Sequence, residues 1–194
     1  MYSRIFKRII DLIIVISISP FLCLLFVPIT IIIKLEDGGP LFYNAKRIGK
    51  NGVTFIMYKF RTMYVNAPDL RRSDGSTIIS KNDPRVTKVG RILRESSLDE
   101  LPQLLNILKG DMSLIGPRPD LEINKEYPEK HYYNLKIKPG ITGYTQAYYR
   151  NQTTWIQKLE YDKYYVDHLT FYLDLKILIS TIIIVLSKKK VYRE

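Results

Sequence analysis

Residues 12–33 read LIIVISISPFLCLLFVPITIII and contain no charged side chain. A helix needs about 20 predominantly apolar residues to cross the hydrocarbon core of a bilayer, so this stretch predicts a membrane segment. A cleaved signal peptide is the competing interpretation. The run is long for a signal peptide, however, and no small-x-small cleavage site follows it before Lys34. The sequence therefore predicts a protein that is held to a membrane by this segment.

Ser19 and Pro20 lie near the middle of the apolar run, and Pro28 follows them. An internal proline removes a helical hydrogen bond, and a nearby hydroxyl often satisfies the carbonyl that loses its partner. We therefore expect a sharp break at Ser19 and Pro20. Basic residues, Arg4 and Lys7 among them, precede the run and the rest of the chain is basic as well, so both flanks have the character of cytoplasmic segments. Charge alone leaves open a kinked spanning helix and a segment that turns back.

The charge balance indicates the kind of partner. The chain of 194 residues has 30 Lys and Arg against 19 Asp and Glu, a net charge of +11. Such a surplus favours phosphate-bearing partners, whether nucleotides, nucleic acid or anionic lipid. A single cysteine and two histidines exclude a disulfide framework and a metal cluster of Cys or His. Any metal would have oxygen ligands, which favours Mg²⁺ and allows Mn²⁺.

The sequence divides into three parts: a membrane segment over residues 1–36, a central domain over 37–168, and a C-terminal part over 169–194. The apolar run at residues 177–186 is too short to span a bilayer, and three lysines follow it. It predicts a helix lying in the membrane interface, with its lysines on anionic headgroups, or a buried core helix with a solvated tail.

The central domain predicts an α/β fold that is mainly helical. Residues 40–43 and 53–60 have the β-branched and aromatic content of short strands, and the turn between them predicts a small β-hairpin. Helical spacing of apolar residues covers 86–95 and 101–108, with Gly110 as a C-cap, and returns over 155–169.

Residues 96–103 read SSLDELPQ and contain the acidic pair Asp99 and Glu100. Ser97 and Glu100 match a capping box, in which neither acid reacts. Pro102 argues against that register, because it would occupy a helical position that needs a backbone donor. A helix start near Asp99 places the proline in the first turn, where no donor is needed. The helix dipole there favours an ionised carboxylate and a bound phosphate, so the pair is a candidate for phosphate chemistry as well as for a cap or a solvated salt bridge.

Several basic residues are candidates for binding phosphate. Arginine makes bidentate contacts with phosphate oxygens, and flanking prolines reduce the entropy that is lost when the arginine is fixed. Arg118, between two prolines in GPRP, is therefore the strongest candidate. The others are equally consistent with solvated surface charges: Lys59, Arg61, Arg85 and Arg94. The chain has no P-loop and no GxGxxG turn.

The chain resembles the small monotopic phosphoglycosyl transferases, bacterial sugar transferases that begin polysaccharide and glycoconjugate assembly on a polyprenol carrier. The resemblance runs essentially from end to end and rests on motifs in the expected order: ISP in the membrane run, KRIGKNG, YKFRTM, DPRVTKVGRILRESSLDELPQLLNILKGDMSLIGPRP, KPGITG, DKYYV and LDLKIL. It implies that Ser19 and Pro20 make a re-entrant helix, which enters and leaves the same leaflet. It also implies a catalytic domain on the cytoplasmic face of the bacterial inner membrane.

The resemblance further implies roles for individual residues. Asp99 would be the nucleophile that attacks the β-phosphate of a UDP-sugar and releases UMP, and polyprenol phosphate would then attack the sugar phosphate left on the enzyme. Glu100 would orient the site or act as a base. Mg²⁺, in contact with Asp99, would neutralise the diphosphate. Arg118 would bind the nucleotide or phosphate with support from Lys59, Arg61 and Arg94. Asp162 matches an acidic family position whose role is left open.

One departure from the family concerns the sugar. After KPGITGYTQ the family usually has a small residue or glycine before Arg-Asn, whereas this chain has Tyr148 and Tyr149. A bulky residue is expected to reshape a loop that contacts the sugar, so the sugar is not assigned by analogy.

The expected partners are a UDP-sugar, polyprenol phosphate and anionic membrane lipid, and the oligomeric state is open, a homo-oligomer included. A non-catalytic basic scaffold that binds anionic lipid and recruits assembly enzymes is the alternative from another class. Nucleic-acid binding is disfavoured, because the basic residues form no recognisable motif and the membrane segments argue against it.

Overall fold

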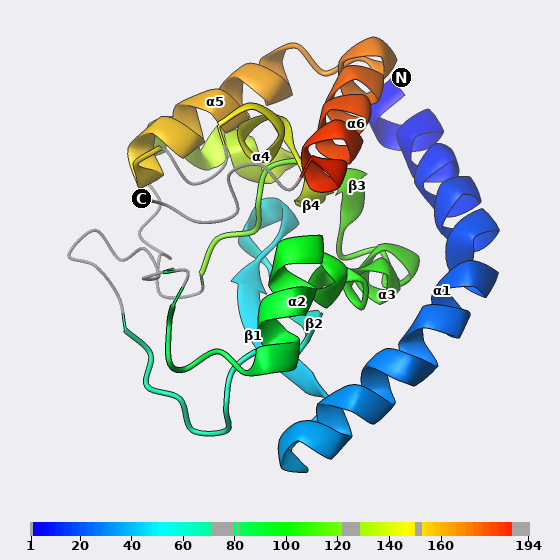
Figure 1. Cartoon of the computed structure of the whole chain (residues 1–194). Helices are drawn as coiled ribbons and strands as arrows, with labels where there is room; N and C mark the ends of the chain where they lie inside the picture. The colour runs from blue at the N-terminus through cyan, green and yellow to red at the C-terminus, as the bar shows by residue number, and fades with distance from the viewer. Residues whose placement is uncertain (1, 71–79, 81, 122–128, 150–152, 188–194) are drawn as a thin grey trace.

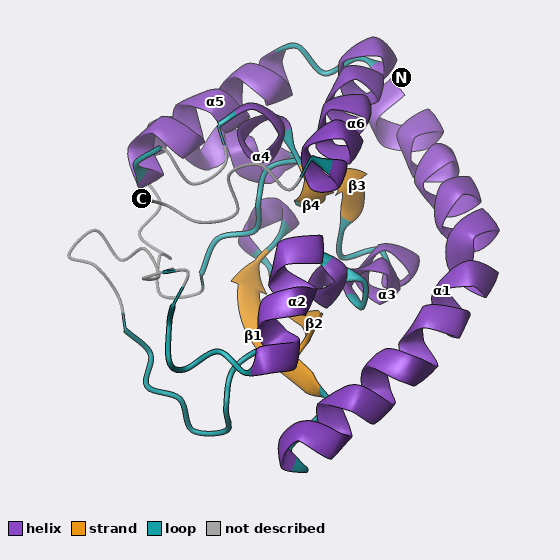
Figure 2. Cartoon of the chain, in the orientation of Figure 1, coloured by secondary structure: helices purple, strands orange, loops and turns teal. Residues whose placement is uncertain are grey.

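The computed structural model describes residues 2–70, 80, 82–121, 129–149 and 153–187 (Figure 1). In these parts of the chain, helices predominate, and the strands form two small two-stranded sheets (Figure 2). This confirms the predicted class, a mainly helical fold with a small hairpin.

The membrane segment forms one long helix, α1 (Lys7–Asp37), after a π-helical turn over Tyr2–Phe6. Within the described residues, α1 is the helix that is long and apolar enough to cross a membrane by length and composition. Large apolar side chains in its middle are exposed, including Phe21 at 71% and Leu24 at 74%. The helix curves along one side of the rest of the fold (Figure 1). These features support association with a membrane.

Helical structure continues through both prolines of α1, so the sharp break expected at Ser19 and Pro20 is replaced by curvature within a continuous helix. Pro20 has no N–H to donate to the carbonyl of Ile16, four residues earlier. The Ser19 hydroxyl donates to that carbonyl at 2.8 Å. The acceptor that Pro20 leaves free is thereby satisfied within the helix.

The predicted hairpin is present as β1 (Phe42–Ile48) and β2 (Thr54–Phe60), which pair antiparallel around the turn η2 (Lys50–Gly52). β1 is longer than the strand expected at residues 40–43. Its Ala45 and the facing Met57 of β2 are buried with Val15 of α1, so the membrane helix shares a core with the hairpin.

Two further helices match the predicted ones. α2 (Lys88–Ser96) begins after Thr87, whose hydroxyl accepts from the backbone N–H of Gly90. α3 (Gln103–Lys109) ends at Gly110, which has φ 94° and confirms the expected C-cap. Between them lies a single 3-10 turn, η3 (Leu98–Glu100). α2 and α3 therefore flank the segment with the acidic pair.

A short parallel sheet, β3 (Ser113–Ile115) with β4 (Gly140–Thr142), follows α3. The two strands approach closely: a Cβ on Gly140 would lie 2.1 Å from the backbone nitrogen of Gly116. A larger residue is therefore excluded there, and the GPRP turn after β3 is held against β4.

The remaining helices are η5 (Glu129–Lys136), α4 (Tyr144–Tyr148), α5 (Trp155–Asp167) and α6 (Phe171–Leu186). α5 begins with a capping box between Thr154 and Gln157 and corresponds to the helix expected at 155–169.

The predicted C-terminal helix, α6, has features of an interfacial helix and of a buried core helix, the two interpretations that the sequence left open. Asp174 and Ile177 are buried against the domain, whereas Ile183 and Leu186 are 60% and 78% exposed. One side of α6 thus packs on the core and another presents apolar residues outward, as an interfacial helix does. The three lysines at 188–190 lie outside the described residues.

Candidate active site

Asp99 and Glu100 lie in the 3-10 turn η3, one residue after α2. Ser97 has φ 58° and makes no side-chain cap, so the capping-box interpretation is wrong. Pro102, with φ −61°, directly precedes α3, where its missing N–H leaves no helical bond unmade. Helical structure starts at Leu98. This is one residue before Asp99, near which the position of Pro102 predicted a helix start.

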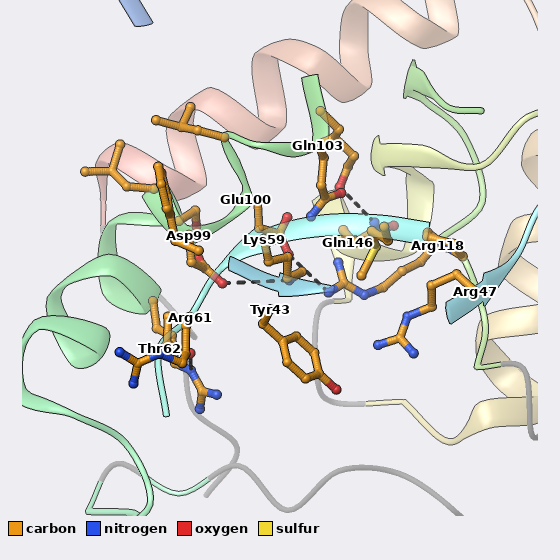
Figure 3. A pocket seen from close by; sticks show the side chains of 18 of the residues that line it. Tyr43, Arg47, Lys59, Arg61, Thr62, Asp99, Glu100, Gln103, Arg118 and Gln146 are labelled. Atoms are coloured by element: carbon orange, nitrogen blue, oxygen red, sulfur yellow. Dashed lines mark hydrogen bonds and ion pairs between the residues drawn. The ribbon is translucent and has the colours of Figure 1, made fainter. Parts of the chain in front are cut away.

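Lys59 and Arg118 converge on the two acids (Figure 3). Lys59 Nζ lies 2.5 Å from Glu100 Oε1 and 3.7 Å from Asp99 Oδ2. Arg118 Nη2 donates to the same Glu100 oxygen at 3.1 Å. Lys59 comes from β2 and Arg118 from the GPRP turn after β3. The structure therefore brings together four of the residues that the sequence singled out.

The two carboxylates have opposite pKa shifts. Burial, with a smaller contribution from the charge of Glu100, raises the pKa of Asp99 even though Lys59 acts against it. Burial would also raise the pKa of Glu100, but the charges and hydrogen bonds of Lys59 and Arg118 outweigh it and lower that pKa to about 2. Glu100 is thus a firmly ionised counterion for two cations.

Asp99 and Glu100 also differ in the hydrogen bonds that their carboxylates accept. Glu100 accepts from both Lys59 and Arg118. In the described part of the chain, by contrast, no donor is hydrogen bonded to the carboxylate of Asp99, which is only 9% exposed. Asp99 therefore keeps its lone pairs available for reaction, as a nucleophile requires.

These side chains line a cleft of about 1270 Å³ that has a polar and an apolar part. The polar part surrounds the acidic pair (Figure 3). The apolar part is formed by side chains from α1, α3, β3, β4 and α6: Ile18, Leu104, Leu114, Ile141, Leu178, Ile184 and Val185. The cleft thus connects the charged centre with α1 and α6, both of which expose apolar side chains.

Arg61 also borders the cleft, but its guanidinium is engaged elsewhere. It pairs with both carboxylate oxygens of Asp37, at 2.5 and 2.6 Å, and donates to the carbonyls of Pro40 and Met63. It is 7% exposed. This geometry favours a structural role for Arg61 over the phosphate contact predicted from sequence.

Arg85 and Arg94 border the same cleft with different surroundings. Arg85 is 8% exposed and binds both oxygens of Asp83, which lowers the pKa of that carboxyl, so a structural role is favoured here too. Arg94 donates to the Thr62 hydroxyl at 2.9 Å, and its charge acts to lower the pKa of Asp99. Of these two, Arg94 is the one whose charge reaches the nucleophile candidate.

Comparison with known proteins assigns the family. Residues 2–188 match the family model described as bacterial sugar transferase. The chain belongs to the bacterial sugar transferase family. This membership makes it an enzyme, and so decides against the non-catalytic scaffold.

Relatives of this sugar transferase include the uncharacterized sugar transferase EpsL of Bacillus subtilis, 47% identical over 78% of this chain and 72% of EpsL. The undecaprenyl-phosphate galactose phosphotransferase of Salmonella typhimurium is 39% identical over 98% of this chain. The UDP-glucose:undecaprenyl-phosphate glucose-1-phosphate transferase of Xanthomonas campestris is 38% identical over 87% of it. The chain spans 42% and 36% of the lengths of these two longer relatives.

Asp162, the acidic residue of open role, lies in the wall of the sugar transferase cleft. It is 4% exposed and accepts from the Thr145 hydroxyl at 2.7 Å. Burial raises its pKa to about 7, and the charge of Asp120 adds to this. The Thr145 hydroxyl, the charge of Lys158 and the backbone N–H of Arg118 act in the opposite direction. Asp162 thus links α5 to the turn that carries Arg118 and titrates near neutral pH.

We expect Asp162→Asn to stabilise the protein, and to do so more at alkaline than at acidic pH. Because the folded state raises this pKa, stability from the protonated group is present below the unfolded value near 4 and is lost as pH rises through about 7. The variant should unfold at least about 5 °C above wild type at pH 8.5, with a gain at pH 5 that is no more than about half as large, by thermal scans at both pH values. Asp167→Asn, which changes a half-exposed acid of α5, is the control. A larger gain at pH 5 than at pH 8.5 would contradict the assignment.

The sequence did not single out several residues that line the cleft. Tyr43 pairs with Lys59 across the hairpin, and Arg47 lies on the same strand beside Arg118 (Figure 3). Gln103 and Gln146 border the cleft as well, and each has one buried polar atom without a hydrogen bond partner in the described structure. The period-two alternation of β1 signals that Tyr43 and Arg47 share a face, but only the hairpin register places Tyr43 opposite Lys59 and Arg47 opposite Phe55.

The family departure at Tyr148 and Tyr149 does not face this cleft: neither residue is among those that line it in the described structure. Tyr149 stacks on Tyr161 of α5 with ring centroids 3.9 Å apart, and Tyr148 packs against Tyr144. Arg150 and Asn151, which follow in the sugar-loop motif, lie outside the described residues.

Among the described residues, no group of three or more His, Cys, Asp or Glu side chains is placed to hold a metal ion. The acidic pair offers two carboxylates, and Lys59 and Arg118 already bind one of them. Mg²⁺ commonly binds through one or two carboxylates together with substrate phosphates. The site therefore fits an ion that arrives with a diphosphate and touches Asp99.

Proposed function

We propose that this sugar transferase moves a sugar 1-phosphate from a UDP-sugar to polyprenol phosphate through a covalent aspartyl-phosphosugar on Asp99. The observation that carries the proposal is a buried carboxylate that accepts no hydrogen bond from the described residues, beside two cations, in a cleft that continues into an apolar part. The names of the Salmonella and Xanthomonas relatives, which specify undecaprenyl phosphate as a substrate, support this choice of acceptor.

In the first step, a carboxylate oxygen of Asp99 attacks the β-phosphorus, which carries the sugar. The bond from this phosphorus to the oxygen that bridges the two phosphates breaks, and the bridging oxygen leaves with UMP. Lys59 and Arg118 supply positive charge where negative charge develops, and Arg94 adds to the local field. Mg²⁺, held by Asp99 and the diphosphate, would neutralise charge on the diphosphate when bound.

In the second step, an oxygen of polyprenol phosphate attacks the same phosphorus and displaces the Asp99 carboxylate. The products are a polyprenol diphosphate sugar and free enzyme. A phosphate monoester is largely dianionic at neutral pH, so it needs no base. With a pKa of about 2, Glu100 is a poor proton acceptor. Of the two roles considered for Glu100, orienting Lys59 and Arg118 is therefore the better supported.

The acceptor reaches the site along the apolar part of the cleft, which Ile18 of α1 and Leu178, Ile184 and Val185 of α6 help to line. Both of these helices expose large apolar side chains. A polyprenyl chain seated there keeps its phosphate near Asp99 while its tail stays in the membrane. The hydrophobic effect favours this position of the polyprenyl chain, because its tail passes from lipid to the apolar cleft without being exposed to water.

A re-entrant course for α1 also belongs to this proposal. Lys7 at its start pairs with Asp174 of α6, and Asp37 at its end pairs with Arg61 beside β2. Both ends thus contact one domain, whereas a spanning helix separates its ends by about 30 Å of hydrocarbon. This geometry supports entry and exit at one leaflet. Because UDP-sugars are made in the cytoplasm, we place the domain on the cytoplasmic face of the bacterial inner membrane.

The proposed reaction is tested with full-length protein in nanodiscs, Mg²⁺ and a panel of UDP-sugars. We expect about one UMP per enzyme without acceptor, and continuous UMP release once polyprenol phosphate is added. Release of UDP instead of UMP would show transfer of the sugar alone and would refute the proposal, as would a lack of release with every sugar.

A further inference from the structure

The last turn of the membrane helix is bound to the N-terminus of α2. Glu36 Oε1 accepts from the backbone N–H groups of Lys88 and Val89 at 2.7 and 3.3 Å, and its Oε2 lies 3.2 Å from the second donor. Thr87 accepts from Gly90, so the first three donors of α2 are satisfied. One residue after its other end, α2 leads into the turn that holds Asp99.

The residue after Glu36 makes an equivalent contact with β2. Asp37 binds the guanidinium of Arg61 through both carboxylate oxygens, at 2.5 and 2.6 Å. Arg61 directly follows β2 and also donates to the Pro40 and Met63 carbonyls. Because Lys59 lies two residues before Arg61, this ion pair fixes the end of the strand from which Lys59 reaches the acidic pair.

The first turns of the membrane helix bind β3, the strand that precedes the turn with Arg118. Asp11, 4% exposed, accepts from the Ser113 hydroxyl at 2.7 Å and from the backbone N–H of Leu114 at 3.2 Å. Both donors are in β3, which leads into the GPRP turn with Arg118. Lys7, one turn earlier, pairs with Asp174 at 2.6 Å and secures this end of the helix to α6.

We infer that α1 is an internal scaffold of the active site as well as an anchor, with Asp11, Glu36 and Asp37 as positioning residues. Each of these carboxylates holds a different segment, and the three segments carry Arg118, the acidic pair and Lys59. The significance of the arrangement for catalysis rests on the proposed function. The contacts themselves do not depend on it.

The inference has a physical consequence. A displacement of about 1 Å between reacting groups is enough to cost up to a hundredfold in rate, so the spacing of the three segments matters to the reaction. Because one continuous helix sets that spacing, a change in how α1 lies in the membrane is transmitted to Asp99, Lys59 and Arg118 together.

The test compares Glu36→Ala with Glu36→Gln in full-length protein in nanodiscs. Alanine removes the acceptor, whereas the glutamine side-chain oxygen still accepts from the two amides. We expect Glu36→Ala to lower kcat for UMP release about tenfold while the Kd for UMP changes less than about twofold, and Glu36→Gln to restore most of the loss. Amide hydrogen exchange should rise at residues 88–90 and 97–100 in Glu36→Ala only.

Asp167→Ala, which removes a half-exposed carboxylate that pairs with Lys163 on α5, is the matched control and should change neither quantity. The inference is overturned if Glu36→Ala leaves kcat and exchange as in wild type, or if alanine and glutamine lose activity equally. If Glu36→Ala does not fold, Asp37→Asn replaces it, with exchange at residues 59–63 as the readout. Exchange decides the inference even if wild type releases no UMP, a result that would refute the proposed function alone.

Discussion

Asp99→Asn is expected to lose UMP release by about three orders of magnitude or more, because an amide cannot form the acyl phosphate that the proposed first step requires. The substitution keeps the shape of the side chain. Burial raises the pKa of Asp99, so the folded state already disfavours the charge that the variant removes. We therefore expect its unfolding temperature to equal or exceed that of wild type, which separates lost chemistry from lost folding.

The decisive measurement is mass spectrometry of the enzyme after incubation with a UDP-sugar and Mg²⁺ in the absence of acceptor. Wild type should gain one sugar phosphate on the tryptic peptide of residues 95–109, and the gain should disappear when polyprenol phosphate is added. Glu100→Gln is the matched control: it retains Asp99, so it should still form the adduct, although more slowly. An adduct on another peptide, or one that forms in Asp99→Asn, would refute the role of Asp99.

Local chemistry explains which features of the site the sequence predicted. Pro102 set the register of the helical segment because its missing N–H is tolerated only near a helix start. Ser19 was expected to satisfy a carbonyl near Pro20, and it does, but the result is a continuous helix where a break was expected. Each of these inferences depends on residues within four positions of each other.

Long-range pairing explains what the sequence did not predict. Arg61 was selected for its charge, but its partner Asp37 is 24 residues away and neutralises it. Tyr43 borders the site only because the hairpin register sets it opposite Lys59. Glu36 contacts amides 52 and 53 residues later in the chain. No periodicity within a single element carries such information, because tertiary packing decides it.

Lys59→Met is expected to lower both stability and activity, because it removes the cation that pairs with both buried acids and leaves Arg118 alone to pair with Glu100. The folded state lowers the pKa of Glu100 from 4.5 to about 2. This stabilisation is present above the unfolded value and is lost as pH falls from about 4.5 toward 2. A shift of this size corresponds to about 3 kcal/mol, to which Lys59 and Arg118 both contribute. We expect the variant to lose about 2 kcal/mol at pH 7.

The loss should become smaller near pH 4, where Glu100 of the variant takes up a proton and no longer needs a cation. UMP release should fall at least about a hundredfold, since the positive charge nearest to Asp99 is gone. Thermal unfolding at pH 7 and pH 4, together with UMP assays at pH 7, measures both effects.

The double variant Lys59→Met/Glu100→Gln separates the two effects. Removing the Glu100 charge, which Arg118 alone would then pair, should return most of the lost stability, because the buried site carries one negative charge fewer. Activity should not return with it, because the lysine that faces the proposed nucleophile is still absent. If instead the double variant is no more stable than Lys59→Met, the stability of this site does not depend on pairing Glu100 with a cation. Glu100 would then be free for a role other than holding Lys59 and Arg118 in place.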